Sequence, residues 1–453
     1  MGANGKRFGR RRFVRGAGAG AALVTIVPRH VLGGPGKKAP SDKLNIAGIG
    51  VGGRGGGDVN AVASENIVAL CDVDERRAAG SFKKFPNAKR FADFRKMFDQ
   101  MHKEIDAVVV GTPDHTHAVA CMAALQHKKH VYCEKPLAHS IHEIRRLQRA
   151  AREAKVVTQV GNQGHSSDRI RMLCEWVWDG AIGKVREVHA ACDAFGGRYS
   201  AVGQLDKLKE KHDVPKELNW DLWLGPAQQR PYHPMYVPTW WRAWLPFGTG
   251  RIGDWICHVV DPAFWALSLG APVAVTAEAK GYDPTKHALV YPPAVKITYE
   301  FAATTQRDYP VTLTWYDGTW KMPHPECLEE KRKVPGTGAI LVGETGGITH
   351  GSHGAGGARI VPEKLMRDTK QPDEKIPRVK GHHRDWLDAI RNGRAAGSDF
   401  DYGGQLTELA LLGVIAIKFL GQRLQWDAEK AQFTNCSEAN PYVNPPYRQG
   451  WKL

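Results

Sequence analysis

The first third of the chain alternates between short, wholly apolar runs and longer segments with apolar residues at helical spacing. Continuously apolar runs are typical of strands that are covered on both faces, as in parallel sheets. Helices are expected between them, at about 56–63, 116–127 and 141–155. This order predicts an α/β domain with a doubly wound parallel sheet. The expected strands lie at 44–49, 66–72, 105–110, 130–133 and 156–161.

The pattern changes in the second half, where apolar and polar residues alternate one by one. Such alternation is typical of strands with one covered face, and it appears at 273–280, 294–303 and 310–318. One more strand is expected at 339–342, and the glycine-rich segment 343–360 is expected to form loops and turns. These elements predict a second, α+β domain with a large open, mostly antiparallel sheet. Two late helices, the second long and strongly apolar, are expected to pack back on the first domain.

The net charge of +16 comes mainly from the N-terminus. Residues 1–38 carry nine Lys and Arg and no Asp or Glu, so the rest of the chain has 54 basic against 47 acidic residues. A mild excess of this size without a basic stripe is weak support for nucleic-acid binding. We therefore expect no nucleic-acid partner.

The same N-terminus has the form of an export signal. Arg10 and Arg11 precede an apolar stretch from about Gly16 to Val27, which is too short to span a bilayer. The pattern resembles a twin-arginine signal. It predicts a periplasmic protein that contacts the membrane only during export. The alternative is a basic, disordered tail on a cytoplasmic protein.

The eight cysteines are scattered and form no CxxC pair. Neither a zinc knuckle nor a redox pair is therefore indicated, although disulfides stay open for an exported protein. A metal site needs three or four converging ligands. The spacing of the histidines predicts no such cluster, and we expect no metal.

A glycine-rich segment, "GIGVGGRGGG", follows the first predicted strand. It fits G-x-G-x-x-G in two registers, and the register Gly50, Gly52 and Gly55 leaves the strand unbroken. Such glycines let the chain turn sharply and approach a pyrophosphate at the N-terminus of a helix. Asp72 follows 22 residues after Gly50, where an acidic residue would hold ribose hydroxyls. This predicts a Rossmann domain for NAD rather than NADP, because a carboxylate repels a 2′-phosphate; Asp72 could equally be an ordinary turn residue.

Two further stretches carry candidate chemistry. Glu134 and Lys135 stand where the fourth strand ends, at the edge where open parallel sheets bind ligands. In "GTGRIGDWICHVVDP", Asp254 and His258 are four residues apart and share one face of a helix expected to start near Ile252. Taking a hydride from a secondary alcohol needs a base for the proton and a donor for the developing charge. An imidazole and a lysine suit these tasks, although helix histidines, turn lysines and capping aspartates are commonly structural.

The motifs GxGxxG, CDVD, GTPDHTH and EKP, in this order, resemble those of the Gfo/Idh/MocA oxidoreductase family over roughly 43–430. The spacing of Asp254 and His258 resembles the family's D-x-x-x-H motif. The resemblance implies that Lys135, Asp254 and His258 are catalytic, with either Lys135 or His258 taking the proton. It also implies NAD as cofactor and a homo-oligomer, a dimer or a tetramer.

The expected sites combine these motifs. The residues expected to bind the cofactor are Gly50, Gly52, Gly53, Arg54, Gly55, Asp72, Thr112, Pro113, His115, His117, Glu134 and Lys135. The domain junction and the tryptophan-rich segment 219–248, expected to be an irregular loop, supply the substrate contacts. These are Gln163, His165, Tyr236, Trp240, Trp241, Arg242, Asp254 and His258. Trp220 and Trp223 are expected to pack in the interior, and His382 and His383 to lie at the surface.

The expected domain organisation follows. An export signal or disordered segment comes first, then an NAD-binding Rossmann domain and an α+β domain for substrate binding and oligomerisation. Helices that pack back on the Rossmann domain and an extended tail complete the chain. The boundaries are 1–38, 39–160, 161–375, 376–430 and 431–453.

These observations predict an exported, NAD-dependent oxidoreductase. It would transfer a hydride between nicotinamide and a secondary hydroxyl of a sugar, polyol or glycoside, so that its partner is a small carbohydrate. One alternative is a glycosidase that works by transient oxidation with NAD, elimination, hydration and re-reduction; such relatives depart from EKP, which this chain keeps. Another is a non-catalytic sugar-binding protein on a dehydrogenase fold.

Overall fold

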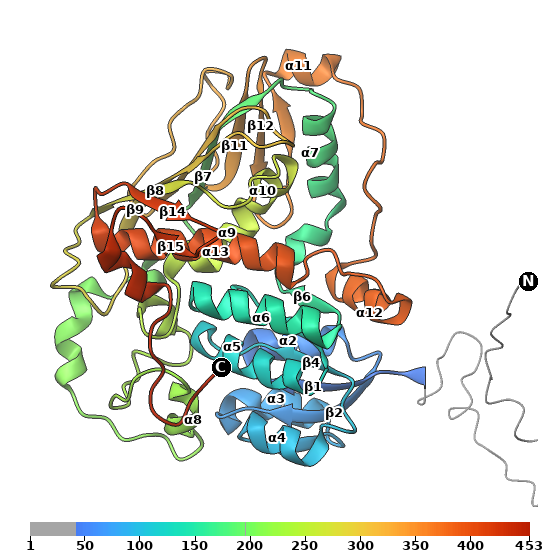
Figure 1. The fold of residues 1–453 in the computed structure, drawn as a ribbon, viewed down its shortest axis with the longest axis vertical. Coiled ribbons are helices and arrows are strands. Elements are labelled where there is room, and N and C mark those ends of the chain that lie inside the picture. Colours follow the sequence, from blue (N-terminus) through green and yellow to red (C-terminus); the bar gives the residue numbers. More distant parts are fainter. Residues whose placement is uncertain (1–41, 195) are drawn as a thin grey trace, which may run out of the picture. The chain divides into compact units, whose positions relative to one another are not determined.

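The computed structural model describes residues 42–194 and 196–453, and Leu44–Leu453 form one compact unit (Figure 1). The predicted export signal at 1–38 lies outside the described residues. No helix of the described part is both long and apolar enough to cross a bilayer.

Six parallel strands form the first sheet, in the order β3-β2-β1-β4-β5-β6. The order reverses between β1 and β4, so the loops after these strands flank the point where such sheets bind ligands. The predicted doubly wound domain is confirmed. Its strands are β1 (Asn45–Ile49), β2 (Asn66–Cys71), β3 (Lys89–Phe91), β4 (Ala107–Val110), β5 (His130–Cys133) and β6 (Thr158–Val160). Its helices are α2 (Gly53–Ala61), α3 (Glu75–Lys84), α4 (Phe94–Met101), α5 (Asp114–Gln126) and α6 (Ile141–Ala154).

The starts of these helices have local causes. The Asp74 side chain accepts hydrogen bonds from two backbone N–H groups at the start of α3. Ser140 and Glu143 form a capping box at the start of α6. Helix α2 begins at Gly53, three residues earlier than predicted, and no side chain caps it. Its first N–H groups therefore have no side-chain cap to satisfy them, and a bound anion could take that place.

Nine strands form the second sheet, in the order β13-β12-β11-β7-β10-β9-β8-β14-β15. β7 and β10 pair in parallel and the other neighbours are antiparallel, as the alternating pattern predicted. The strands are β7 (Val185–Cys192), β8 (Ala274–Lys280), β9 (Ala294–Phe301), β10 (Val311–Asp317), β11 (Thr337–Gly343), β12 (Gly347–Gly351), β13 (Arg359–Val361), β14 (Leu424–Asp427) and β15 (Gln432–Phe433). The main helices that accompany them are α7 (Asp168–Trp178), α8 (Trp220–Leu224), α9 (Gly250–Val259), α10 (Asp261–Ala266), α11 (Glu363–Asp368), α12 (His382–Asn392) and α13 (Phe400–Ala416).

Three local predictions are corrected. The glycine-rich segment 343–360 contains strand β12, which pairs with β11; its glycines hide the alternation that marks other strands. The apolar stretch 406–427 is helical only to Ala416, or Phe419 with a short 3-10 turn, and then enters β14 after Gly421, which has a φ of 78°. Segment 219–248 holds the short helix α8 rather than being irregular throughout.

The break between α9 and α10 places the predicted catalytic helix. Helix α9 starts at Gly250, two residues before the predicted start, and ends at Val259. Pro262 lies in the first turn of α10, where its missing N–H leaves no helical hydrogen bond unmade.

The C-terminal helices pack on the first domain. Helix α13 lies beside α6 and also contacts α9, so it lies between the two sheets (Figure 1). Trp386 of α12 is fully buried against the apolar side chains of the first sheet. The expectation that His382 and His383 are surface residues is wrong. His382 is buried with its Nε2 2.7 Å from the Val160 carbonyl, and His383 stacks on Tyr132.

Candidate active site

A cleft of about 470 Å³ opens at the carboxyl ends of the first sheet. One wall consists of loops that follow β1, β2, β4 and β5. The opposite wall comes from the tryptophan-rich segment, from α9 and from the loop between β12 and β13. Predicted residues that line it are Gly50, Gly52, Arg54, Asp72, Thr112, Pro113, Glu134, Lys135, Gln163, Trp241, Arg242, Asp254 and His258.

The glycine-rich loop leaves no room for side chains at two of its predicted positions. Gly50 has a φ of 74°, and a Cβ there would lie 2.7 Å from the backbone nitrogen of Thr112. A Cβ on Gly55 would lie 1.9 Å from the Gly50 carbonyl oxygen. The first position therefore needs glycine for its turn and the third for the close packing of helix on strand, as in dinucleotide-binding loops. Gly53 and Gly55 support this loop and are not themselves in the cleft wall.

Asp72 holds the shape of this loop. One carboxylate oxygen accepts hydrogen bonds from the backbone N–H groups of Val51 and Gly52, at 2.8 and 3.0 Å. The other accepts from the backbone of Asp74 at 3.0 Å. Burial raises the pKa of Asp72, and the backbone hydrogen bonds oppose that shift. Asp72 thus combines a structural role with a position in the cleft wall, where ribose hydroxyls would bind.

Asp254 joins three segments at the centre of the cleft. Lys135 Nζ donates to Asp254 Oδ1 at 2.6 Å and to its backbone carbonyl at 2.8 Å. The other carboxylate oxygen accepts from the Tyr199 hydroxyl at 2.5 Å and from Arg242 Nε at 3.2 Å. Burial alone would raise the pKa of Asp254, but Lys135 and Arg242 hold it far below its usual range. Asp254 is therefore a carboxylate at every working pH.

The same contacts settle the charge of the lysine. Burial opposes the charged form of Lys135, but the Asp254 carboxylate outweighs this effect and raises the pKa of Lys135. The ammonium group stays protonated near neutral pH. It can donate a hydrogen bond to a developing alkoxide, but it is poorly suited to take a proton.

His258 has the opposite electrostatics. Its side chain is buried one helical turn after Asp254, and burial, Lys135 and His353 all lower its pKa well below the ordinary value. The imidazole is therefore neutral. Its Nδ1 is buried and has no hydrogen-bond partner among the described residues. Because the residue lines the cleft, its neutral ring is suited to accept a proton from a bound group.

Sequence reasoning missed several residues of the cleft, among them Asp114, Arg77 and His353. Asp114 follows the TP pair, bonds to Thr249 and has its pKa raised to about 6 by burial and by the charge of Asp254. Arg77 lines the cleft near Asp72, and its guanidinium lies against Gly53. His353 enters from the glycine-rich loop and stacks on His258. Only Asp114 carried a signal, because it lies within GTPDHTH.

Besides Gly53 and Gly55, the structure places five predicted residues outside the cleft wall. His115 and His117 are buried, and both nitrogens of each ring lie within hydrogen-bond distance of backbone carbonyls. They join loops of the fold rather than line a ribose site. His165 is also buried; its Nδ1 lies 3.1 Å from Asp261, and its ring stacks on Trp265.

The remaining two belong to the tryptophan-rich segment. Tyr236 is buried in an aromatic cluster with Trp244 and Phe247, so it packs rather than contacts substrate. Trp240 is 38% exposed and lies outside the cleft. The sequence could not distinguish aromatic residues that line the cleft from those that pack in the interior. Tyr236 and Trp240 each follow a proline, and only the fold decides in which direction the chain continues after it.

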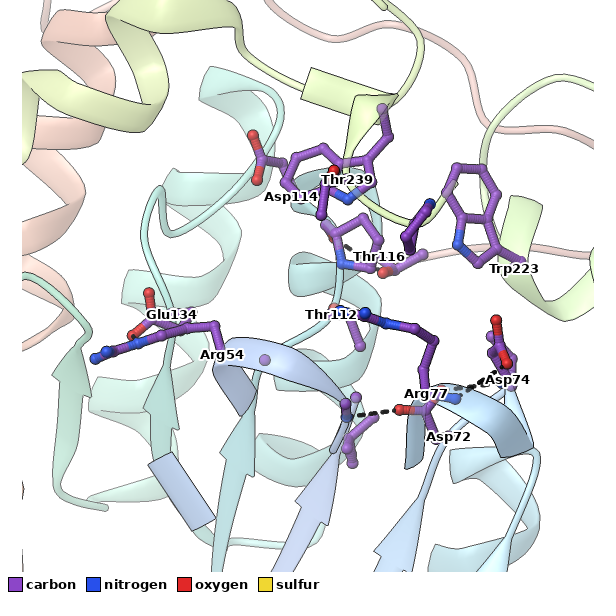
Figure 2. A pocket seen from close by; sticks show the side chains of 18 of the residues that line it. Arg54, Asp72, Asp74, Arg77, Thr112, Asp114, Thr116, Glu134, Trp223 and Thr239 are labelled. Carbon is purple, nitrogen blue, oxygen red and sulfur yellow. Dashed lines mark hydrogen bonds and ion pairs between the residues drawn. The ribbon is translucent and has the colours of Figure 1, made fainter. Parts of the chain in front are cut away.

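Segment 217–223 closes the end of the cleft beyond Asp72. The backbone N–H of Glu75 donates to the Glu217 carbonyl at 3.0 Å, and that of Asn219 donates to the Val73 carbonyl at 2.8 Å. Trp223 was expected only to pack, but it also lines the cleft, across from Asp72 and Arg77 (Figure 2). We call residues 217–223 the strap. At the other end, Arg54 pairs with Glu134 at 3.1 Å (Figure 2).

One group of potential metal ligands occurs among the described residues, away from the cleft. Atoms of Glu210, His212 and His233 lie within 4.8 Å of one another, and their spacing in the sequence did not predict this. The backbone N–H of Met235 donates to His233 Nδ1 at 3.1 Å. Its Nε2 therefore carries the proton in the neutral ring, which is the wrong form for a ligand.

The glycine-rich loop lies where the strand order of the first sheet reverses, and helix α9 of the second domain faces it across the cleft. This arrangement is typical of two-domain enzymes that bind a dinucleotide. The sequence matches the oxidoreductase family, NAD-binding Rossmann fold, over 44–162, and the C-terminal alpha/beta domain of the same family over 169–306. The chain belongs to the Gfo/Idh/MocA oxidoreductase family.

Several curated proteins are similar over part of the chain. Inositol 2-dehydrogenase of Rubrobacter xylanophilus is 32% identical over 152 residues, which is 32% of this chain and 43% of that protein. Levoglucosan dehydrogenase of Pseudarthrobacter phenanthrenivorans is 27% identical over 217 residues, 48% of this chain and 46% of that protein. The chain thus spans less than half the length of these curated relatives.

Solved structures share the fold over most of the chain. The WlbA dehydrogenase from Bordetella pertussis, in complex with NADH and UDP-GlcNAcA, has a TM-score of 0.60 at 16% identity and covers 85% of this chain and 99% of its own. An inositol dehydrogenase homolog from Azotobacter vinelandii, complexed with NAD+, has a TM-score of 0.58 at 16% identity, over 86% and 99%. At these identities the similarity establishes the fold alone.

Proposed function

We propose that the protein is an NAD-dependent oxidoreductase that transfers a hydride between nicotinamide and a secondary hydroxyl of a sugar, polyol or glycoside. One observation carries the proposal: Lys135 of the first domain and Asp254 of the second meet at 2.6 Å in the cleft, one helical turn from a neutral His258. The glycine cradle supports NAD as the cofactor, because the loop has the shape that a pyrophosphate requires.

The proposed mechanism divides the work among these side chains. NAD, when bound, supplies the hydride acceptor. His258 takes the hydroxyl proton, since its ring is neutral and the residue lines the cleft. Lys135 stays protonated and stabilises the alkoxide that develops on the substrate oxygen. Asp254 fixes the lysine and keeps it charged. This arrangement favours His258 over Lys135 as the base.

The substrate class has support from two sides. Polyol and sugar dehydrogenases occur among the relatives. Trp241 and Arg242 line the cleft, with the guanidinium 4.0 Å from the centre of the indole ring. An aromatic face and a polar edge together suit a carbohydrate ring.

A redox-neutral glycosidase is the second candidate. A relative 28% identical over 109 residues is a 2,7-anhydro-N-acetylneuraminate hydratase of Mediterraneibacter gnavus, and the strap covers the cofactor end of the cleft. Formation of free reducing sugar from a glycoside without accumulation of NADH would favour this candidate. A non-catalytic binding protein would show neither NAD in the purified protein nor turnover.

We also propose that the protein is exported and forms a homo-oligomer. Export rests on the arginine pair and apolar stretch of residues 1–38. Fractionation of cells that express the full chain, with an Arg10→Lys, Arg11→Lys variant as comparison, tests it. Sedimentation of the purified protein tests the oligomer.

Replacing Lys135 by Met tests the proposed function. The variant should keep bound NAD, measured by mass spectrometry of released cofactor, and lose turnover by at least about 100-fold. The assay uses myo-inositol, levoglucosan and pooled glycosides. A variant as active as the wild type would remove the lysine from the mechanism, and a wild type without NAD would refute the cofactor.

A further inference from the structure

The loop between β12 and β13 brings a second histidine into the cleft. The His353 ring stacks on His258 with 4.0 Å between ring centres and 16° between planes. Its backbone N–H donates to the His258 carbonyl at 2.8 Å, and Trp255 packs edge-on against it at 5.5 Å. The His258 ring is therefore held on one side by helix α9, to which it belongs, and on the other by the His353 ring.

The backbone of this loop is strained where it enters the cleft. His353 and Ala355 have φ values of 56° and 59°, and Gly354 has 86°. Left-handed conformations are unfavourable for residues with a Cβ and persist only where the surroundings impose them. Ala355 is fully buried in the main core. The turn thus places its neighbour His353 at the surface of the cleft.

A backbone contact with the first domain's end fixes the loop further. A Cβ on Gly354 would lie 2.3 Å from the Gly164 carbonyl oxygen, and a Cβ on Gly164 would lie 2.3 Å from the Gly354 nitrogen. Because Gly164 and Gly354 have no side chain, the backbones of these two segments can lie in direct contact. Gly164 belongs to the NQGH segment, whose Gln163 also lines the cleft.

We propose that His353 is a positioning residue of the active site, which holds the His258 ring by face-to-face stacking and forms the substrate-side wall next to it. The inference rests on the proposed function. The His353 ring is exposed, and its Nδ1 lies 2.9 Å from Ser352 Oγ. Its outer edge is therefore available to a substrate hydroxyl. Stacked rings do not hydrogen bond through their faces, so His353 acts on His258 through its position and charge.

The charges around the pair define a second readout. Lys135 and Arg54 lower the pKa of both rings and Asp254 opposes them, and His353 lowers the pKa of His258 further. Removing His353 should therefore raise the pKa of His258 and move the acid limb of kcat/KM to higher pH. A purely structural loop residue would leave this limb in place.

Three variants test the proposal. His353→Gly removes the ring and relieves the left-handed strain, so loss of folding does not confuse the result. His353→Phe keeps a stacking ring without nitrogen. His324→Ala, an exposed histidine outside the cleft, is the control. Measurements are NAD content, thermal unfolding, kcat and KM on myo-inositol and levoglucosan, and histidine NMR of the His258 ring.

The expected pattern separates stacking from substrate contact. The Gly variant should lose roughly tenfold in kcat, as small misplacements of a catalytic group do, and shift the His258 signal. The Phe variant should recover most of kcat and keep a raised KM. Wild-type kinetics and an unchanged His258 signal in the Gly variant would overturn the proposal. If the wild type turns over nothing, the proposed function fails, and the NMR shift alone decides whether His353 positions His258.

Discussion

At the scale of single residues, Asp254 determines what the cleft can do. One buried carboxylate binds Lys135, Arg242 and Tyr199. It stays ionised because two cations compensate for its burial. The ionised carboxylate in turn keeps the lysine protonated, and in the proposed mechanism His258 is therefore the proton acceptor. Removing the carboxylate should therefore alter both stability and chemistry.

We predict that Asp254→Asn lowers kcat by at least about 100-fold and destabilises the fold by roughly 3–5 kcal/mol, since it leaves a buried cation without its partner. Steady-state kinetics and chemical denaturation measure the two effects. Asp308→Asn is the matched control. Its pair with Lys184 is exposed, so the change should leave the stability close to that of the wild type. Equal effects of both substitutions would contradict the central role of Asp254.

A second residue-scale prediction concerns pH. Burial raises the pKa of Asp317 to about 6, although Arg251 at 3.7 Å opposes the shift. Between about pH 4 and 6 the folded state therefore binds more protons than the unfolded state, so stability should fall as pH rises through this window. Asp317→Asn should remove that part of the slope, up to roughly 3 kcal/mol. Urea denaturation at pH 4.5 and 7 measures it; an unchanged slope would show that Asp317 titrates normally.

At the scale of elements, helix α2 offers a matched pair of glycines. A Cβ on Gly55 meets the Gly50 carbonyl at 1.9 Å, whereas a Cβ on Gly57 meets nothing within 4 Å. Gly55→Ala should displace the loop and abolish NAD binding. Gly57→Ala should keep NAD and stabilise the helix by about 0.5–1 kcal/mol. The NAD content and the melting temperature of the two purified variants measure these effects. If both variants retained NAD, the loop would tolerate a side chain at Gly55, and the prediction would be wrong.

The elements of the first sheet were predictable because buried parallel strands are continuously apolar and glycine loops mark their ends. Strand β12 was not, since it begins and ends with glycine, Gly347 and Gly351, and so has few side chains to show an alternation. Its place is decided by pairing with β11, the preceding strand of the same hairpin, rather than by the preference of its own residues. The histidine that this hairpin carries into the cleft was hidden for the same reason.

At the scale of the whole molecule, the strap ties the second domain to the end of β2. The Asn219 N–H donates to the Val73 carbonyl, and the Asn219 side chain caps α8. Leu222 and Trp223 of the strap line the cleft, so a dinucleotide bound there would contact them. The molecule should therefore release NAD slowly, which suits an enzyme that reuses its cofactor.

We predict that Asn219→Pro speeds NAD release roughly tenfold, because a hydrogen bond and a cap of about 1 kcal/mol each are lost. The native φ of −84° is close to that of proline, so strain is small. Stopped-flow fluorescence of bound NADH measures the rate. Asp213→Pro, in the exposed coil before the strap, is the control. Equal release rates in wild type and Asn219→Pro would show that the strap does not retain the cofactor.

The sequence by itself determined the Rossmann domain, the glycine cradle and the identities of Lys135, Asp254 and His258, because these depend on local pattern and fixed spacing. Only the tertiary structure decided which other side chains reach the cleft. His115, His117 and His165 are residue types that often occur in active sites. Their ring nitrogens, however, lie within hydrogen-bond distance of backbone carbonyls or of Asp261. His353, 95 residues beyond His258, reaches the cleft instead. The hairpin of β11 and β12 and the backbone contact of Gly354 with Gly164 set that position, and the alternation of apolar and polar residues does not reveal either of them.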